Sequence, residues 1–432
     1  MKPLRFDASG SIDPELGITS RQISDLRPML EQARTRFLET TGFQTADSAA
    51  ETGGGGFYSL PPRQLADYES KRRDSLLGKI FTAANGLHDH IDAVVVVGSE
   101  QRLLGSQALM AACCDPHHNE LPRGQRGSKP RMYFASAPFD NDGIQSLLSR
   151  LAIGGIGPSD AVHRWAVVWL DDANDAAGKL QTIALLEALS ASLGDQADSW
   201  LPRLNLSIHG ECLSIDGAAE GLARDVRFTF PVDWPIAQSV LSCSSLLHAA
   251  FLGLDCMKLL EGAVAINQQF ESAEFPENLP LQWAAVQHLQ TRHHNCHRRL
   301  MLWEPSLDQV GQWYGNLLSD VLGVELIRVP RGGPEVASAG SPCVQWLVDH
   351  CRADPVKISD SVPDDPDGRT SLSLDDRRGE AIRAFQVQHR LQGMGVSNLH
   401  LPTIDTYVLG QLFQLLMIAT AMESQLRRVP SS

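Results

Sequence analysis

Three aspartates follow closely on an apolar segment, Trp165–Leu170. They are Asp171, Asp172 and Asp175, and the next positive charge along the chain is Lys179. Two unit charges about 4 Å apart repel by about 1 kcal/mol in water and about 4 kcal/mol at an effective dielectric of about 20, so this loop opposes an anionic ligand. Neighbouring carboxylates can also hold a divalent cation, but acidic loop residues are usually only solvated. We therefore predict an acidic loop without a metal ion.

Ser99 follows a second apolar segment, Ala93–Val97. Where a strand runs into a helix, the free N–H groups of the first helical turn form a general anion site. Ser99 could contact a ligand there, and Arg102 could supply a positive charge. The alternative is an ordinary turn in which Ser99 only caps the helix.

Two other clusters contain residue types that bind metals, at His293–His297 and Cys114–His118. Neither is accompanied by another ligand pair at a recognised zinc spacing. We interpret both as polar turns and predict neither a metal nor a cofactor.

The composition is typical of a globular protein with two or three cores. Of the 432 residues, 43% are hydrophobic and 20% are charged. The net charge of −14 argues against nucleic acid and anionic membranes as partners. The amino terminus lacks the apolar core of a signal peptide and no CxxC pair occurs, so we expect a cytoplasmic protein with reduced thiols. Polar residues interrupt the uncharged stretch Trp234–Leu254, which predicts a buried helix rather than a membrane span.

Short apolar runs alternate with longer helix-like segments, which predicts an α/β fold of parallel strands and crossover helices. We predict a helical N-terminal arm at 1–60, a first unit at 61–230, a second unit at 231–400 and a C-terminal helix at 401–432. The predicted strands are Ala93–Val97, Arg131–Ala135, Trp165–Leu170 and Leu204–Ile208 in the first unit, and Arg299–Trp303, Glu325–Val329 and Pro355–Ile358 in the second.

A ligand site at the strand ends requires Ala93–Val97 and Trp165–Leu170 to be neighbours in one parallel sheet. Between the two units, the stretch from Ser239 to Phe270 is expected to be helical.

Short segments along nearly the whole chain match one known family in order. They are Leu4–Asp7, Phe57–Pro61, His118–Leu121, Arg126–Gly127, Pro130–Phe134, Ser239–Ser242, Leu246–Leu247, Gly253–Asp255, Leu260–Ala263, Glu304–Leu307, Trp313–Tyr314 and Gly410–Phe413. Through them the chain resembles glucose-6-phosphate isomerase of the shorter bacterial type. The resemblance implies two sugar-isomerase domains, each a parallel sheet between helices, and an active site at a dimer interface.

The family's reaction interconverts an aldose and a ketose phosphate through an enediol. It needs a carboxylate base, a positive group beside the enediolate, an acid for ring opening and a phosphate cradle. Asp320 aligns with the base but is one methylene shorter, which could cost about 10²-fold in rate. The family's arginine aligns with Ala237 and its histidine with Ala337. Its closing lysine is expected to be missing, because the sequence stops at Ser432.

The family's two sugar-phosphate loops also differ here. An inner glycine pair of the first loop is replaced by Glu100–Gln101, which leaves Ser99 and Arg102 as candidate contacts. The phosphate loop has lost most of its hydroxyls, which leaves Lys179 and Thr182.

The resemblance therefore implies a glucose-6-phosphate isomerase family member, and the substitutions predict lost or much reduced catalysis. One alternative is a non-catalytic carbohydrate-binding or regulatory protein. Another is a structural partner of an active paralogue. The expected partners are a sugar phosphate or related small molecule and a second subunit, in a homodimer or a heterodimer.

Overall fold

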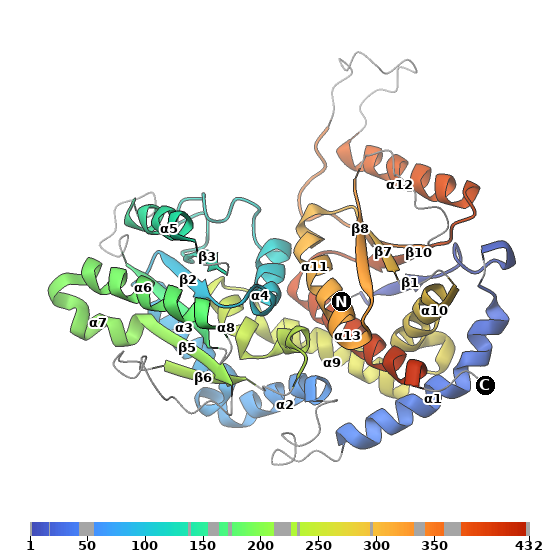
Figure 1. Ribbon diagram of the computed structural model, residues 1–432, viewed down its shortest axis with the longest axis horizontal. Helices are drawn as coiled ribbons and strands as arrows, with labels where there is room; N and C mark the ends of the chain where they lie inside the picture. Colours follow the sequence, from blue (N-terminus) through green and yellow to red (C-terminus); the bar gives the residue numbers. More distant parts are fainter. Residues whose placement is uncertain are drawn as a thin grey trace.

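The computed structural model contains two five-stranded sheets with helices on their faces (Figure 1). It describes residues 2–16, 18–42, 56–136, 140–153, 164–171, 175–210, 226–230, 234–293, 297–331, 342–357 and 373–428. The predicted α/β class with two parallel-sheet units is confirmed.

The first sheet consists of five parallel strands. They are β2 (Ala93–Val97), β3 (Arg131–Ala135), β4 (Trp165–Asp171), β5 (Asn205–Gly210) and β6 (Val226–Phe230). Their spatial order is β3-β2-β4-β5-β6. β2 pairs with β4 in parallel, with Val97 opposite Trp169, so the predicted neighbours are confirmed. All five residues of β2 are buried, as expected of a strand covered on both faces.

The second sheet has four parallel strands and one antiparallel strand. They are β1 (Arg5–Asp7), β7 (His297–Leu302), β8 (Glu325–Val329), β9 (Cys343–Val348) and β10 (Val396–Leu401). The order is β1-β10-β9-β7-β8, and β1 is the antiparallel member. The predicted N-terminal arm thus contributes a strand to the second sheet. The division of the chain into four ranges stays a prediction.

Helices connect the strands and cover both sheets. In chain order they are α1 (Ser20–Gly42), α2 (Gly56–Lys71), α3 (Leu76–His88), α4 (Glu100–Cys113), α5 (Asn141–Ile153), α6 (Ala176–Leu193), α7 (Ala197–Leu204), α8 (Cys243–Phe251), α9 (Cys256–Ser272), α10 (Leu279–His293), α11 (Asp308–Leu322), α12 (Leu374–Leu391) and α13 (Thr406–Arg428). Six 3-10 turns accompany them: η1 (Pro14–Leu16), η2 (Arg72–Asp74), η3 (Gly194–Gln196), η4 (Ile236–Leu241), η5 (Phe275–Glu277) and η6 (Pro305–Leu307).

The stretch from Ser239 to Phe270 is helical in three pieces, parts of η4, α8 and α9. Gly253 adopts a φ of 71°, which ends the preceding helix, and the Asp255 side chain then caps α9. Trp234–Leu254 accordingly falls on η4 and α8, and no helix in the described ranges is long and apolar enough to cross a membrane.

Three strands of the second sheet, β1, β9 and β10, were not predicted, and one predicted strand was wrong. Polar residues interrupt the apolar runs of β9 and β10, where Gln345 and Ser397 are fully buried. Residues 355–357 form no strand beyond a single bridge from Lys357 to Ser373, and Ile358 lies outside the described residues. β6 was also missed, because as an edge strand it alternates exposed and buried side chains.

Two helices cross at very short range in the second unit. A side chain on Gly410 of α13 would place its Cβ 1.8 Å from the Leu259 carbonyl oxygen of α9. A side chain on Gly262 of α9 would lie 2.0 Å from the Tyr407 carbonyl oxygen of α13. Both glycines belong to segments that carry the family resemblance, so these matches have a structural cause.

Candidate functional site

The first sheet contains one point where the strand order reverses. From β2 the chain moves to β3 on one side, and later strands β4, β5 and β6 build up on the other. Helices α4 and α6, which follow β2 and β4, therefore leave toward opposite faces of the sheet, an arrangement that predicts a crevice at the carboxyl ends of the strands. Open α/β sheets bind ligands at this position. The four predicted contact residues belong to the starts of these two helices: Ser99 and Arg102 at α4, and Lys179 and Thr182 at α6.

Ser99 is the residue that precedes α4. Its side chain makes no capping hydrogen bond, and its buried hydroxyl oxygen has no partner in the described part of the chain. The predicted alternative, in which Ser99 merely caps the helix, is therefore not what the geometry shows. Arg102 lies one turn further along, with its side chain half-buried.

Asp175 occupies the amino terminus of α6. Its Oδ1 accepts a 2.8 Å hydrogen bond from the Gly178 N–H, so a carboxylate already fills the place where an anion would bind. The half-buried Lys179 follows in the same turn. Thr182 is buried, and its hydroxyl donates to the Gly178 carbonyl at 2.8 Å. The amino terminus of α6 is thus capped by a carboxylate, while α4 has Glu100 in its first turn and a buried, unpartnered hydroxyl at Ser99.

The rest of the acidic loop is only partly described. Asp171 is the last residue of β4 and pairs with His209 of β5 in the backbone register. Asp172 lies outside the described residues, as do His294–Cys296 of the predicted polar turn. Among the described residues, no group of three His, Cys, Asp or Glu side chains could hold a metal ion.

Comparisons with known proteins agree on one family. A glucose-6-phosphate isomerase from Symbiobacterium thermophilum is 24% identical, over 98% of this chain and 91% of the relative. Another, from Listeria monocytogenes, is 22% identical over 75% of this chain but only 65% of its own length. The chain matches no protein-family model.

Solved structures agree on the fold. A hypothetical protein from Thermus thermophilus superimposes with a TM-score of 0.74 at 23% identity, covering 98% of this chain and 94% of that one. A glucose-6-phosphate isomerase from Chlamydia trachomatis gives a TM-score of 0.69 at 12% identity, covering 94% and 82%. The chain is thus distantly similar to glucose-6-phosphate isomerases along nearly its whole length. Its fold is the two-domain sugar-isomerase arrangement.

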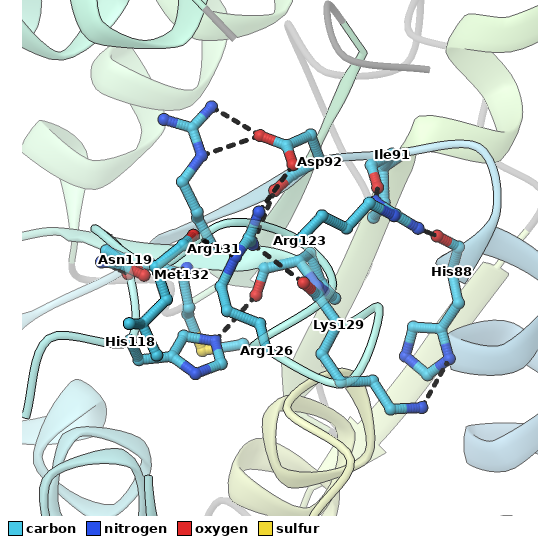
Figure 2. A network of polar contacts seen from close by, with 12 residues as sticks. His88, Ile91, Asp92, His118, Asn119, Arg123, Arg126, Lys129, Arg131 and Met132 are labelled. Atoms are coloured by element: carbon cyan, nitrogen blue, oxygen red, sulfur yellow. Dashed lines mark hydrogen bonds and ion pairs between the residues drawn. The ribbon is translucent and has the colours of Figure 1, made fainter. Parts of the chain in front are cut away.

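Several family segments build a polar network at the amino ends of β2 and β3 (Figure 2). The Asp92 carboxylate accepts 2.8 Å hydrogen bonds from the buried guanidinium groups of Arg126 and Arg131. The Asn119 amide exchanges two hydrogen bonds with the Met132 backbone, at 2.7 and 2.8 Å. These residues fix where the two strands start, at the opposite end of the sheet from Ser99. Their match to the family therefore reflects a shared fold and not a shared catalytic site.

Ala237, which is predicted to align with the family's arginine, is buried. Ala237 lies in η4 with 4% of its surface exposed. Its carbonyl accepts a 2.9 Å hydrogen bond from the indole N–H of Trp313, which belongs to α11. Ala337, aligned with the family's histidine, lies outside the described residues.

Asp320 lies near the carboxyl end of α11 and is exposed. Partial burial raises the pKa of its carboxyl group, and no residue in the described part of the chain pairs with it. On the same helix, Gln312 contacts Glu100 at the start of α4 at 3.4 Å. Eight residues of α-helix span about 12 Å, so Asp320 is well removed along α11 from that contact.

The second sheet has an equivalent crossing point, between β7 and β9, that the sequence analysis missed because β9 was not predicted. The cavity there has a volume of only about 90 Å³, room for a few water molecules. Arg378 pairs with Glu304 at its rim, and Arg352 donates to the Cys113 carbonyl at 2.9 Å. These contacts join elements rather than leave space for a sugar.

Proposed function

We propose that this family member binds a small, uncharged carbohydrate at the carboxyl edge of the first sheet and does not isomerise glucose 6-phosphate at a useful rate. The observation that carries the proposal is the burial of Ala237, whose carbonyl accepts a hydrogen bond from the Trp313 indole. A methyl group offers no positive charge to an enediolate, and loss of one such donor typically costs about 10²–10³ in kcat.

The charge at the candidate site supports an uncharged ligand. Asp175 holds a carboxylate at the start of α6, where a phosphate would need positive charge. Ser99, with its unpartnered hydroxyl, is the proposed hydrogen-bonding contact. Arg102 and Lys179 are proposed contacts at the rim.

Catalysis is tested with protein purified from a host that lacks its own isomerase. A coupled assay should detect no conversion of fructose 6-phosphate above background, because Asp320 has neither a positive partner nor a ring-opening acid in the aligned positions. Activity within about 10³-fold of ordinary enzymes, abolished by Asp320→Asn but not by Asp308→Asn on the same helix, would refute the proposal.

Binding is tested by thermal stabilisation. A ligand at 100 times its Kd stabilises a protein by about 2.7 kcal/mol, so a neutral hexose that binds the crevice should raise Tm in a saturable way. The shift should shrink in Ser99→Ala, and glucose 6-phosphate should give a smaller shift than glucose. A larger shift with the phosphate ester would restore the enzyme interpretation.

A further inference from the structure

A second cavity lies between α3, the end of α7 and the edge strand β6. Its volume is about 580 Å³. Arg203 comes just before β5 begins, and Arg227 is the second residue of β6, so the cavity reaches the amino-terminal side of the sheet. It is therefore separate from the crevice at Ser99. Within the part of the chain that the structure describes, it is lined by Arg73, Lys79, Thr82, Ala83, Gly86, Leu87, Arg203, Arg227 and Phe228.

Four of these nine lining residues are cationic and none is acidic. The side chains of Arg73, Lys79 and Arg227 are exposed, and within the described ranges none of the three forms an ion pair or a hydrogen bond. Like charges held together raise one another's electrostatic energy. In a protein with a net charge of −14, such a concentration of unneutralised positive charge indicates a complementary anion.

Arg203 is held in place before any ligand arrives. Its guanidinium lies 4.7 Å from the centre of the Trp200 ring, and Arg164 lies 4.3 Å from the same ring. Arg164 is in turn hydrogen-bonded to Gln196 at 2.7 Å. Cation–π contacts of this kind restrict the side chain, which lowers the entropy cost of binding.

Arg73 stands on a turn with an unusual backbone. Its neighbour Arg72 adopts a φ of 47°, in the left-handed region that non-glycine residues rarely occupy. The Ser75 hydroxyl donates to the Arg72 carbonyl at 2.7 Å. A Cβ on Gly78 would come within 2.0 Å of that carbonyl oxygen, so only glycine permits the turn. Strained backbone of this kind is concentrated at functional sites.

The floor of the cavity is apolar. Leu87 and Phe228 are only 4% and 3% exposed, and Ala83 lies beside them. A volume of about 580 Å³ falls in the range of small-molecule sites, roughly 300–1,000 Å³. A concave site of this size with an apolar floor suits a compact organic molecule better than an extended polymer.

We propose that this cavity binds a small metabolite that carries two or more phosphate groups. The four cationic side chains neutralise the phosphates, and the apolar floor receives the organic part. A nucleoside polyphosphate and a sugar bisphosphate share this chemistry. The site is independent of the proposed carbohydrate crevice.

Isothermal titration calorimetry of the full chain tests the proposal with inorganic triphosphate, a nucleoside triphosphate and a hexose bisphosphate. At least one should bind with a stoichiometry of one and a Kd below about 1 mM. The double variant Arg203→Gln/Arg227→Gln should weaken binding by roughly tenfold or more. The probe that binds most tightly distinguishes a nucleotide from a sugar source. Failure of all three probes to bind overturns the proposal.

Two controls separate this site from general electrostatics and from the crevice. Arg21→Gln/Arg383→Gln removes the same charge from exposed positions elsewhere and should leave the Kd within about twofold. Ser99→Ala should leave it unchanged. An equal loss in either control contradicts the proposed site. If the Arg203 variant unfolds, the exposed Lys79→Gln should still weaken binding, and an unaltered Kd there counts against the site.

Discussion

At the scale of single residues, Ala237 shows how one substitution can close a site. Arginine at this position would bring a charged group into a place that is 4% exposed and whose carbonyl is bonded to the Trp313 indole. Burying an unpaired charge is costly, so Ala237→Arg should lower the free energy of unfolding by about 3 kcal/mol or more and should not restore isomerase activity.

Urea denaturation measures this effect directly. Ala66→Arg, at an exposed position on α2, should change the free energy of unfolding by less than about 0.5 kcal/mol. A stable Ala237→Arg variant with measurable turnover would show that the site opens readily, contrary to the proposal.

The sequence predicts candidate site residues but not their hydrogen bonds. The acidic character of the loop before α6 can be predicted from the sequence, because it depends only on which residues are present. That Asp175 caps α6 through the Gly178 N–H, and that the Ser99 hydroxyl remains unpartnered, depends on backbone geometry. No spacing rule distinguishes a capping side chain from a free one when both precede a helix.

At the scale of elements, the crossing of α9 and α13 depends on two glycines. In Gly410→Ala the new Cβ would lie 1.8 Å from a backbone oxygen, which cannot rotate away as a side chain could. The helices must separate, and overpacking of this kind costs about 1–3 kcal/mol. Thermal unfolding should therefore show a lower Tm.

Gly315→Ala on α11 is the matched control. Its Cβ would meet Leu326 at an ordinary contact distance of 3.5 Å. Replacing glycine by alanine inside a helix gains about 0.5–1 kcal/mol, so this variant should be as stable as the parent or more stable. A loss of stability equal to that of Gly410→Ala would mean that the close crossing is not the cause.

Whether a strand could be predicted from the sequence depends on how apolar its own residues are. β2 and β4 were predicted because both faces of the strand are apolar, and such runs need no partner to be recognised. β9 was not predicted because a polar residue, Gln345, is buried within it and interrupts its apolar run. The Gln345 side chain accepts from the Trp303 indole at 2.8 Å and donates to Asn398 of β10 at 3.1 Å. A buried glutamine becomes plausible only when those partners, more than forty residues away on either side, are known.

At the scale of the whole molecule, the two units are joined by buried contacts rather than by a linker alone. Ser106 of α4, in the predicted first unit, bonds to His248 of α8, in the predicted second unit, at 2.7 Å. Both the Ser106 and His248 side chains are fully buried. Such contacts tie the protonation of interior groups to the stability of the entire fold.

Several buried histidines make that stability sensitive to acid. Burial is the principal cause that lowers the pKa of each of them. They are His88, His118, His248, His288 and His389. Because a lowered pKa means that the folded state favours the neutral ring, their stabilising contribution is present above the unfolded pKa of about 6.5 and is lost as the pH falls.

His248 provides the clearest test, because complete burial lowers its pKa to about 4. The unfolded chain binds this proton below pH about 6.5 while the folded protein resists it until pH about 4, so stability falls across that window. Between pH about 7 and pH about 5, His248 alone should account for a loss of about 2 kcal/mol. Asparagine can retain a hydrogen bond to Ser106 but cannot titrate, so His248→Asn should flatten the pH dependence measured by urea denaturation. His117→Gln, at an exposed side chain, should keep the parent slope. A His248→Asn slope identical to that of the parent would place the acid sensitivity elsewhere in the molecule.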